Sequence, residues 1–546
     1  MLRTTLAISL LFGLVACDAS AQRRLPGTLV IVSGEYATLP VPTLMEGPAS
    51  TTENTHVADL LFLRLAVEGP GRSTLDESGY EPQLARSWSR RDSLTLVFEL
   101  DPRARWHDGR NVTAEDVVFT FQRAMNPVIA PSLAELLQGI DAVRSEGQRR
   151  VVISFKRPYP EQFFDATHYV QPLPAHLLRA LDPDSIAISD FAQAPVGNGA
   201  FRWSRAVPGQ LLEFTANPAF FLGRPGIGRI VIRVATDASA RLNLLLSGEA
   251  DALRAPVPPL SNRDQLEARG FRLVTIPSSS VGYLLFNTHA RGDSARPHPI
   301  LADVRVRRAL VLALDRDAML RSMLGPYAKV PYGPIPTSLW LSELAPKAAD
   351  RDSMQAAQLL DAAGWRDSNG DGIRDRNGAP LALTVEVPGT SMLRRRLTEI
   401  AMAQHRELGI DLSMTVSDRG VWMERLNGGN FDVIFGSLSQ EPTPSAFPQT
   451  WSCEGSGNAS GWCEPVVDSL MTAARRATGD ATPVWLAAMR ALEESAPAAF
   501  LYAPYDVVAL HRRFENVSLR PGSPWMMAWR WRVRRGAEIA RDRVPR

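Results

Sequence analysis

The stretch RWHDGRNVTAEDV, residues 105–117, joins a tight turn to the start of a helix. His107–Gly109 forms the turn, because Asp and Gly readily accept a positive φ. The run Thr113–Asp116 is a capping-box pattern, which predicts a helix that extends to about Ala124. A lone histidine in such a turn is given a structural role here, and not the role of a metal ligand or a catalytic base.

Short β-rich runs alternate with amphipathic segments along the rest of the chain. Strands are predicted at 28–33, 94–100, 151–155, 211–215, 230–234, 271–276, 281–287, 381–387 and 411–416. Helices are predicted at 238–247, 303–324, 353–363 and 393–408. This alternation indicates an α/β fold with largely parallel strand pairing.

The composition is that of a folded protein with more than one core. A chain of 546 residues is too long for one compact core and indicates two or three packing units. Hydrophobic residues make up 45% and charged residues 22%, which is ordinary for a globular protein. The formal net charge of +2 gives no reason to expect a nucleic acid partner.

The N-terminus has the pattern of an export signal. Arg3 supplies a positive charge, and Leu6–Ala16 is an apolar run too short to remain as a membrane-spanning helix. The run ends in Leu-Val-Ala before Cys17, which resembles the lipobox of bacterial lipoproteins. We expect residues 1–16 to be a signal peptide, Cys17 to be lipidated, and 17–27 to be a tether. The alternative is an ordinary export signal in which Cys17 is incidental.

Two further cysteines, Cys453 and Cys463, remain in the exported chain. Exported proteins form disulfides, so one bridge is the leading interpretation, with free or metal-bound thiols as alternatives. One cysteine pair with no histidine beside it has too few ligands for zinc. The run Asp367–Asp375 resembles the start of a calcium loop, but Gly378 stands where the bidentate glutamate belongs. No metal and no cofactor are therefore assigned.

The stretch at 105–117 resembles a signature of family 5 of the extracellular solute-binding proteins of ABC importers. This family includes dipeptide-, oligopeptide- and nickel-binding proteins. Six other segments resemble motifs of the same family in the same order: 82–88, 195–201, 217–221, 248–251, 303–310 and 362–365. The segment 195–201 departs from the family pattern at Asn198 and Ala200. One match would be weak, but a collinear series identifies the chain as a member of the family.

The resemblance implies the type II periplasmic binding protein fold, an α/β fold of two lobes joined by two crossing strands. The first lobe would comprise 28–275, with an extra subdomain at about 63–189, and would be completed by 500–546. The second lobe would comprise 276–499. A solute would bind between the lobes, and a hinge motion would close them over it.

The resemblance also assigns binding residues. The segment around Phe435 resembles the ligand strand of the peptide-binding members, in which an aromatic residue is followed three positions later by an Asp that pairs with the peptide's α-ammonium group. Here Leu438 stands in place of that Asp, which predicts weak or no binding of free-amino dipeptides. Glu441 is a candidate replacement. The full set of candidate ligand-binding residues is Tyr36, Phe435, Gly436, Ser437, Leu438 and Glu441.

Two alternatives to these assignments stay open. Phe435 and Leu438 could serve only to pack the second lobe. The alternative role for Glu441 is structural, because its place beside Pro442 matches a separate family feature. The resemblance further implies that Cys453 and Cys463 are bridged, as in the dipeptide-binding members.

The function implied is that of a non-enzymatic, lipid-anchored, monomeric receptor that captures a peptide or related solute and delivers it to ABC permease subunits. It would reside on the periplasmic or cell-surface side of the cytoplasmic membrane. One rival is a ligand-sensing partner of a membrane receptor with the same fold. The other is an exported hydrolase. The sequence contains no Gly-x-Ser-x-Gly, P-loop or His-Glu-x-x-His motif in support of an enzyme.

Overall fold

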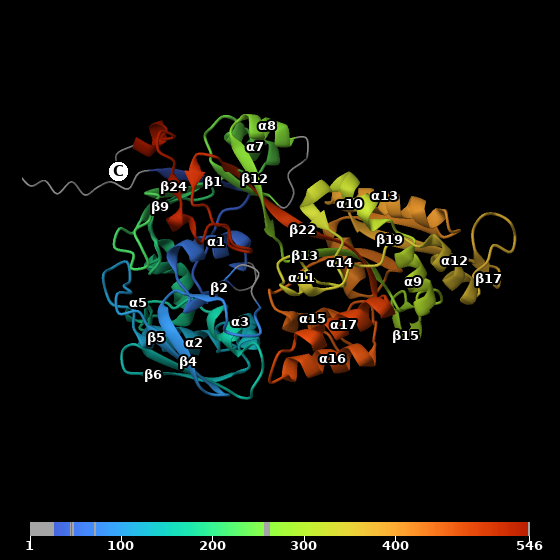
Figure 1. The fold of residues 1–546 in the computed structure, drawn as a ribbon, viewed down its shortest axis with the longest axis horizontal. Helices are drawn as coiled ribbons and strands as arrows, with labels where there is room; N and C mark the ends of the chain where they lie inside the picture. The colour runs from blue at the N-terminus through green and yellow to red at the C-terminus, as the bar shows by residue number, and fades with distance from the viewer. Residues whose placement is uncertain (1–26, 44, 46–48, 70–72, 256–261, 544–546) are drawn as a thin grey trace, which may run out of the picture.

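The computed structural model describes residues 27–43, 45, 49–69, 73–255 and 262–543. Cys17, the predicted signal peptide and all but the last residue of the predicted tether lie outside these ranges. The chain forms two lobes that lie side by side (Figure 1). The blue-to-green N-terminal part and the red C-terminal end build the first lobe, and the yellow-to-orange middle part builds the second.

One mixed sheet of 12 strands runs through both lobes. In the first lobe its order is β8 (Phe201–Val207), β9 (Leu211–Ala216), β10 (Arg229–Val234), β1 (Thr28–Ser33) and β11 (Ala252–Ala255). In the second lobe its order is β13 (Ser280–Phe286), β21 (Val433–Ser439), β19 (Ala382–Pro388) and β20 (Asp411–Ser417). Between them lies β22 (Ala498–His511), which also pairs with β12 (Phe271–Pro277) and β16 (Ala328–Lys329).

Two connections cross between the lobes. The first half of β22 pairs with β13, and its second half pairs with β12. Only Ser278 and Ser279 separate β12 from β13, so these two strands form the second crossing connection. A pair of long, hydrogen-bonded strands therefore holds the lobes together at one edge and leaves their facing surfaces unconnected by other chain segments (Figure 1).

The expectation of largely parallel pairing is wrong. Parallel pairs occur where β1 meets β10 and β11 and where β19 meets β20 and β21. The other ladders between described strands, including those of both crossing connections, are antiparallel. Alternation of strands and helices does not decide which strands pair. Here the long strand β22 brings the chain back against β11, β12 and β13.

A second, antiparallel sheet lies within the first lobe, in the order β4 (Ala85–Asp92), β5 (Thr95–Leu100), β7 (Arg150–Phe155) and β6 (Ile140–Glu146). The other helices of this lobe are α1 (Thr52–Leu61), α2 (Ala114–Ala124), α3 (Pro131–Leu136), α4 (Gln162–Thr167), α5 (Ala175–Leu178), α6 (Asp190–Gln193), α7 (Ala238–Leu246) and α8 (Arg263–Ala268). Its short strand pairs are β2 (Ala66–Glu68) with β3 (Tyr80–Pro82), and β23 (Phe514–Glu515) with β24 (Arg532–Val533).

The turn at His107–Gly109 connects the stretch 105–117 with the segment 195–201. The N–H of Gly197 donates to His107 Nδ1 at 3.1 Å, so Nε2 carries the ring proton and donates to the carbonyl of Gly199 at 3.0 Å. Burial lowers the pKa of His107 to about 4, which keeps the ring neutral. A side chain at Gly197 would collide with the carbonyl of Leu61, 2.0 Å from its Cβ. His107 is thus structural, as predicted.

The helices of the second lobe are α9 (Val304–Leu312), α10 (Arg316–Met323), α11 (Leu341–Leu344), α12 (Ser353–Ala362), α13 (Met392–Arg406), α14 (Arg419–Asn427), α15 (Phe447–Trp451), α16 (Pro465–Arg476) and α17 (Thr482–Ser495). Its short strands are β14 (His289–Ala290), β15 (Asp293–Pro297), β17 (Asp375–Arg376) and β18 (Ala379–Pro380).

The single helix predicted at 303–324 is two helices. α9 ends before Ala313, and α10 begins after Asp315, whose side chain accepts the N–H of Ala318 at 2.8 Å. The apolar spacing continues through the break, but Asp315 satisfies a free N–H at the start of a new helix and so favours a cap over a helix interior. Periodicity alone did not reveal this boundary.

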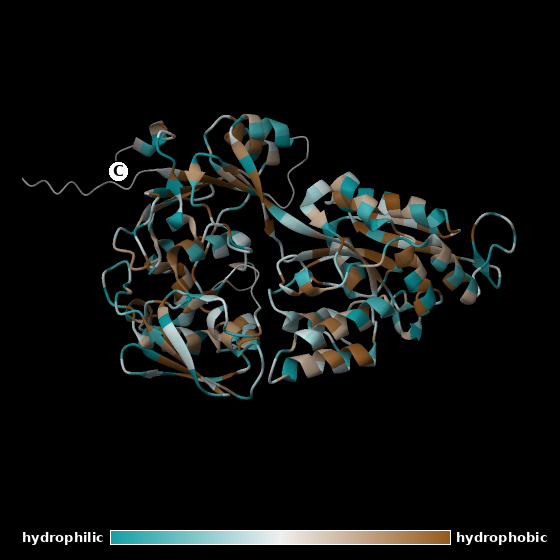
Figure 2. Cartoon of the chain, in the orientation of Figure 1, coloured by the Kyte–Doolittle hydropathy of each residue, from teal (hydrophilic) through white to brown (hydrophobic). Residues whose placement is uncertain are grey.

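Helices cover both faces of the sheet in each lobe. In the second lobe, Phe435 and Val385 face a core that α9, α10, α12 and α13 cover, and Ile434 faces a core that α15, α16 and α17 cover. Figure 2 shows hydrophobic colouring along the strands of the sheet, with hydrophobic and hydrophilic residues alternating along the helices. No helix within the described residues combines the length and the apolar character needed to cross a membrane.

Candidate functional site

The facing surfaces of the two lobes touch at the end far from the crossing strands. Glu161, just before α4 in the first lobe, is 5% exposed. The hydroxyl groups of Thr443 and Ser445, in the second lobe, both donate hydrogen bonds to its carboxylate. Burial raises the pKa of Glu161, and these hydrogen bonds partly offset that effect. The contact therefore joins the lobes through a buried carboxyl group.

A second acid, the half-buried Asp165, lies beside this contact. Burial raises the pKa of Asp165 to about 8, although the hydroxyl of Tyr159 donates to it at 2.7 Å. The positive charge of Arg475, from the second lobe, acts on both Asp165 and Glu161 and lowers their pKa values. Arg157 completes the contact by donating to the carbonyl of Arg475 at 3.4 Å. Closure of the lobes at this end thus removes ionisable groups from water.

A pocket of about 370 Å³ lies at the opposite end of the interface, against the crossing strands. Three parts of the chain line it. β12 forms one wall, residues 337–343 of the second lobe form another, and residues 517–521 of the first lobe form the third. This volume lies within the range of small-molecule sites, which commonly occur between domains.

A hydroxyl group fixes the second-lobe wall of this pocket to the crossing strands. Thr337 Oγ1 lies 2.9 Å from the carbonyl of Pro504 and accepts the N–H of Ser278 at 2.8 Å. The N–H of Ser338 donates to the carbonyl of Ser278 at 3.0 Å. These contacts bridge both crossing connections, so the wall moves with the hinge.

Three buried polar atoms in this pocket have no hydrogen-bond partner among the described residues. They are Arg272 Nε, Ser338 Oγ and Trp340 Nε1. Several other tryptophans of the chain also have an unpartnered Nε1, so Trp340 alone carries little weight. Other arginines, among them Arg202, Arg351 and Arg520, also have an unpartnered Nε, but each donates a hydrogen bond through another guanidinium nitrogen. The side chain of Arg272 makes no hydrogen bond within the described residues, and buried polar groups in native proteins are nearly always satisfied.

The predicted aromatic residue Phe435 lies in the core of the second lobe. Its side chain is 0% exposed. The centroid of the Phe435 ring is 6.5 Å from the ring centroid of Tyr502 and 5.9 Å from the guanidinium carbon of Arg394. Gly436 lies on the other face of β21, where a Cβ would come within 2.5 Å of the ring of Tyr283. The structure thus gives both residues a packing function on the strand that was predicted to bind ligand.

The remaining predicted binding residues are spread over the interface. Ser437 is exposed, and Leu438 is half-buried against the second-lobe core opposite Val281. Glu441 is exposed and near enough to Tyr169 of the first lobe to contribute, after burial, to the raised pKa of that tyrosine. Tyr36 is half-buried on the first-lobe core. No hydrogen bond or ring contact joins Tyr36 to the β21 residues in the described part of the chain.

Sequence reasoning missed the residues of the lobe contact and of the pocket. Glu161 is 282 positions from Thr443, and no motif marks either residue. The pocket draws its lining from three segments that are far apart in the sequence. The only signal available was the family motif around Pro442, which lies next to Thr443 but does not reveal its partner.

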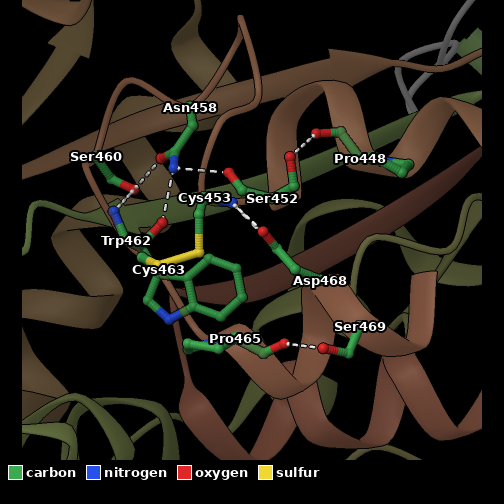
Figure 3. The surroundings of a disulfide bond; sticks show 10 residues. All are labelled: Pro448, Ser452, Cys453, Asn458, Ser460, Trp462, Cys463, Pro465, Asp468 and Ser469. Atoms are coloured by element: carbon green, nitrogen blue, oxygen red, sulfur yellow. Dashed lines mark hydrogen bonds between the residues drawn. A yellow bond between two sulfur atoms is a disulfide. The ribbon is translucent and has the colours of Figure 1, made fainter. Parts of the chain in front are cut away.

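The predicted disulfide between Cys453 and Cys463 is present, with a Cα–Cα distance of 4.4 Å (Figure 3). The N–H of Cys453 donates to the Asp468 carboxylate of α16 at 3.1 Å, and Asn458 donates to the carbonyls of Ser452 and Trp462. These bonds fold the bridged loop against α16, as Figure 3 shows. The loop follows directly on the helix that starts after Thr443 and Ser445.

The acidic loop at 367–375 is held by its own backbone. Asp367 accepts the N–H groups of Gly370 and Gly372, and Asp375 accepts the hydroxyl of Ser368. Within the described ranges, no group of three or more His, Cys, Asp or Glu side chains is placed to hold a metal ion.

Sequence comparison links the chain to a family of binding proteins. The profile described as bacterial extracellular solute-binding proteins, family 5, middle region, matches residues 79–460. A Brucella ovis protein, provisionally named an ABC transporter peptide-binding protein, is 30% identical over 364 residues, 65% of this chain. The match spans 64% of that relative's own length. The oligopeptide-binding protein AppA of Bacillus subtilis is 24% identical over 494 residues, 88% of each chain.

Solved structures share the fold. AppA from Bacillus subtilis, in complex with a nonapeptide, superposes with a TM-score of 0.68 and 22% identity over 93% of this chain and 99% of that one. NikA from Brucella suis, in complex with Fe(III)-EDTA, superposes with a TM-score of 0.78 and 19% identity over 93% and 100%. These matches confirm the two-lobed periplasmic binding protein fold.

Proposed function

Because the chain belongs to family 5 of the bacterial extracellular solute-binding proteins, we propose that it captures a solute between its lobes and delivers it to the permease subunits of an ABC importer. The observation that carries this proposal is the interface itself. It has a pocket at the hinge end and a buried contact between the lobes at the other end. A solute that binds both walls would favour the closed arrangement, which a permease can recognise.

We propose a peptide or a peptide-like molecule as the solute. Support comes from the names of the Brucella ovis and Bacillus subtilis relatives, both described as peptide-binding. Deleting the gene should abolish the uptake of labelled peptides by whole cells, and a plasmid copy should restore it. Unchanged uptake in the deletion strain would contradict the import function.

The rival functions make different predictions. A sensing partner would be encoded beside a receptor kinase, and its loss would change gene expression while uptake continued. A hydrolase would release products from peptides or glycosides in assays of the purified protein. We propose that it is not an enzyme, in line with the solute-binding character of its family.

We further propose that Cys17 is lipidated and anchors the protein to the outer face of the cytoplasmic membrane. The anchor would raise the concentration of the receptor near its permease. Cys17→Ala should release the protein from membranes into the soluble fraction, whereas Ser20→Ala, a nearby control, should not. Membrane fractionation that is the same for both variants would contradict the anchor.

The division into lobes is proposed at the predicted boundaries, 28–275 with 500–546 and 276–499, with a subdomain at about 63–189. The two crossing connections and the separate cores support it. We also propose a monomer, which light scattering after size-exclusion chromatography would test.

A further inference from the structure

Arg272, on β12, is a cation without a carboxylate partner in the described part of the chain. Its Nε atom is buried and makes no hydrogen bond. Other arginines on these strands are paired, as when Arg254 of β11 binds Asp506 at 2.5 Å. A buried donor without a partner is costly, so an external acceptor at this position would be stabilising.

The surroundings of Arg272 are positively charged. Burial lowers the pKa of Arg272, and the charges of Arg534 and Arg512 lower it further. Both neighbours, Arg512 and Arg534, are exposed, and neither forms an ion pair in the described ranges. An anion bound here would interact favourably with all three guanidinium groups.

The rest of the pocket is mainly apolar. Arg272, Val274 and Ile276 lie on the same face of β12, since side chains alternate along a strand. At about 3.3 Å per residue, this face extends roughly 13 Å from Arg272 to Ile276. Opposite it lie Leu339 from the second lobe and Leu519 from the first. The lining also contains polar side chains, namely Thr275, Thr337, Ser342, Glu343 and Ser338, whose hydroxyl is unpartnered. The carboxylate of Glu343 pairs with Lys329 at 3.5 Å.

We infer that this pocket binds the C-terminal carboxylate of the captured peptide, with Arg272 as the carboxylate-binding residue and the apolar walls holding the adjoining side chains. The inference rests on the proposed function. A guanidinium group can bind a planar carboxylate through two parallel hydrogen bonds, which a lysine cannot do. Ser338 would supply a hydrogen bond to a peptide group further along the ligand.

The order of recognition follows from this arrangement. The ligand's carboxyl end is held by Arg272 at the start of β12, and the ligand then runs along the strand toward Ser338, beside the crossing point of the two connections. Its amino end would point toward the interface near Glu441, where the anchor expected from the family is replaced by Leu438. Affinity would therefore depend on the carboxylate and little on the amino group.

The test uses the purified full chain and two matched tripeptide pools, one with free C-terminal carboxylates and one with C-terminal amides. Binding is measured by native mass spectrometry and by titration calorimetry on the best members. Three variants are compared: Arg272→Gln, Arg272→Lys, and Arg233→Gln as a control at an exposed arginine of the same lobe. Circular dichroism and the melting temperature establish that each variant is folded.

We expect the wild type and Arg233→Gln to prefer the carboxylate form by about tenfold or more, the size of effect usual for a charge-assisted hydrogen bond. Arg272→Gln should bind both forms equally, and Arg272→Lys should keep part of the preference. A preference that is absent in the wild type, or that persists in Arg272→Gln, would overturn the inference and leave the proposed function intact. If no member of either pool binds, the peptide assignment fails and this inference fails with it.

Discussion

The carboxylate of Glu161 in the first lobe accepts a hydrogen bond from the hydroxyl of Thr443 in the second. Ser445 donates to the same carboxylate, so one acid of the first lobe contacts two residues that follow the predicted ligand strand. The acid must leave water for this contact to form. Because burial raises the pKa of Glu161, we expect closure of the lobes to be linked to the protonation of this residue.

Solute affinity should rise as the pH falls. Burial raises the pKa of Glu161, so its protonated form favours the closed state. The favourable contribution is complete below the ordinary pKa of a glutamate, about 4.3, and is lost as the pH rises through the raised value. Calorimetry at about pH 5 and about pH 8 should therefore give the tighter binding at the lower pH. Glu161 also interacts with Arg475 and Asp165, which remain in every variant.

Glu161→Gln should reduce this pH dependence, because the amide keeps the shape and hydrogen-bonding capacity of the carboxyl group without a charge. Glu135→Gln, at an exposed position of α3, serves as the control and should behave like the wild type. A pH profile that is identical in Glu161→Gln and the wild type would show that other groups are responsible.

Asp251 should be essential for the stability of the first lobe. It is 1% exposed, accepts the N–H of Val30 at 2.9 Å, and pairs with Arg513 at 2.7 Å and Arg541 at 2.5 Å. Asp251→Asn leaves buried positive charge poorly compensated, so we expect a loss of about 3 kcal/mol in the free energy of unfolding. Urea denaturation measures it.

The control for this prediction is Glu249→Gln, in the same family motif. Glu249 is exposed and pairs with the exposed Arg233, so its loss should leave the denaturation midpoint unchanged. If both variants unfold at the wild-type midpoint, the buried network does not stabilise this lobe.

The disulfide should stabilise the second lobe. Its two cysteines are 10 positions apart. Closing a loop of this length restricts the unfolded chain and so should raise the free energy of unfolding by about 2–3 kcal/mol. The double variant Cys453→Ser, Cys463→Ser should therefore melt at a lower temperature than the oxidised wild type. Reducing the wild type should reproduce this effect, and reduction should not affect the double variant. Equal melting temperatures in all samples would contradict the prediction.

A free amino group should contribute little to binding. Leu438 packs half-buried where the family resemblance leads one to expect an Asp, and Glu441 is exposed near Tyr169. A free dipeptide should therefore bind weakly, and no more tightly than its N-acetylated form, when both are measured by calorimetry. A strong preference for the free amine that Glu441→Gln removes would show that Glu441 replaces the missing acid.

The sequence predicted local structure better than long-range pairing. The strand at 28–33 and the capped helix after Thr113 are as predicted, because each depends on residues close together in the chain. The helix break at Asp315 was not predicted, because the apolar pattern continues through the cap. The antiparallel pairing of the crossing strands was not predicted, because the paired strands lie far apart in the sequence. Family motifs supplied the fold.

The candidate site was the least predictable part. The family pattern directed attention to Phe435, which the structure places in a core. No sequence pattern around Arg272 or Glu161 marks either residue. Arg272 stands out only because its buried Nε has no partner, and Glu161 stands out only because it contacts Thr443 across the interface.

The central claim is that a solute is held between the two lobes. It is tested most directly by native mass spectrometry of the exported protein, purified without denaturation and then incubated with a peptide extract. We predict a discrete added mass, released on unfolding and identified as a peptide with a free carboxyl end. A spectrum that contains only the bare chain, both as purified and after incubation with the extract, would contradict the account.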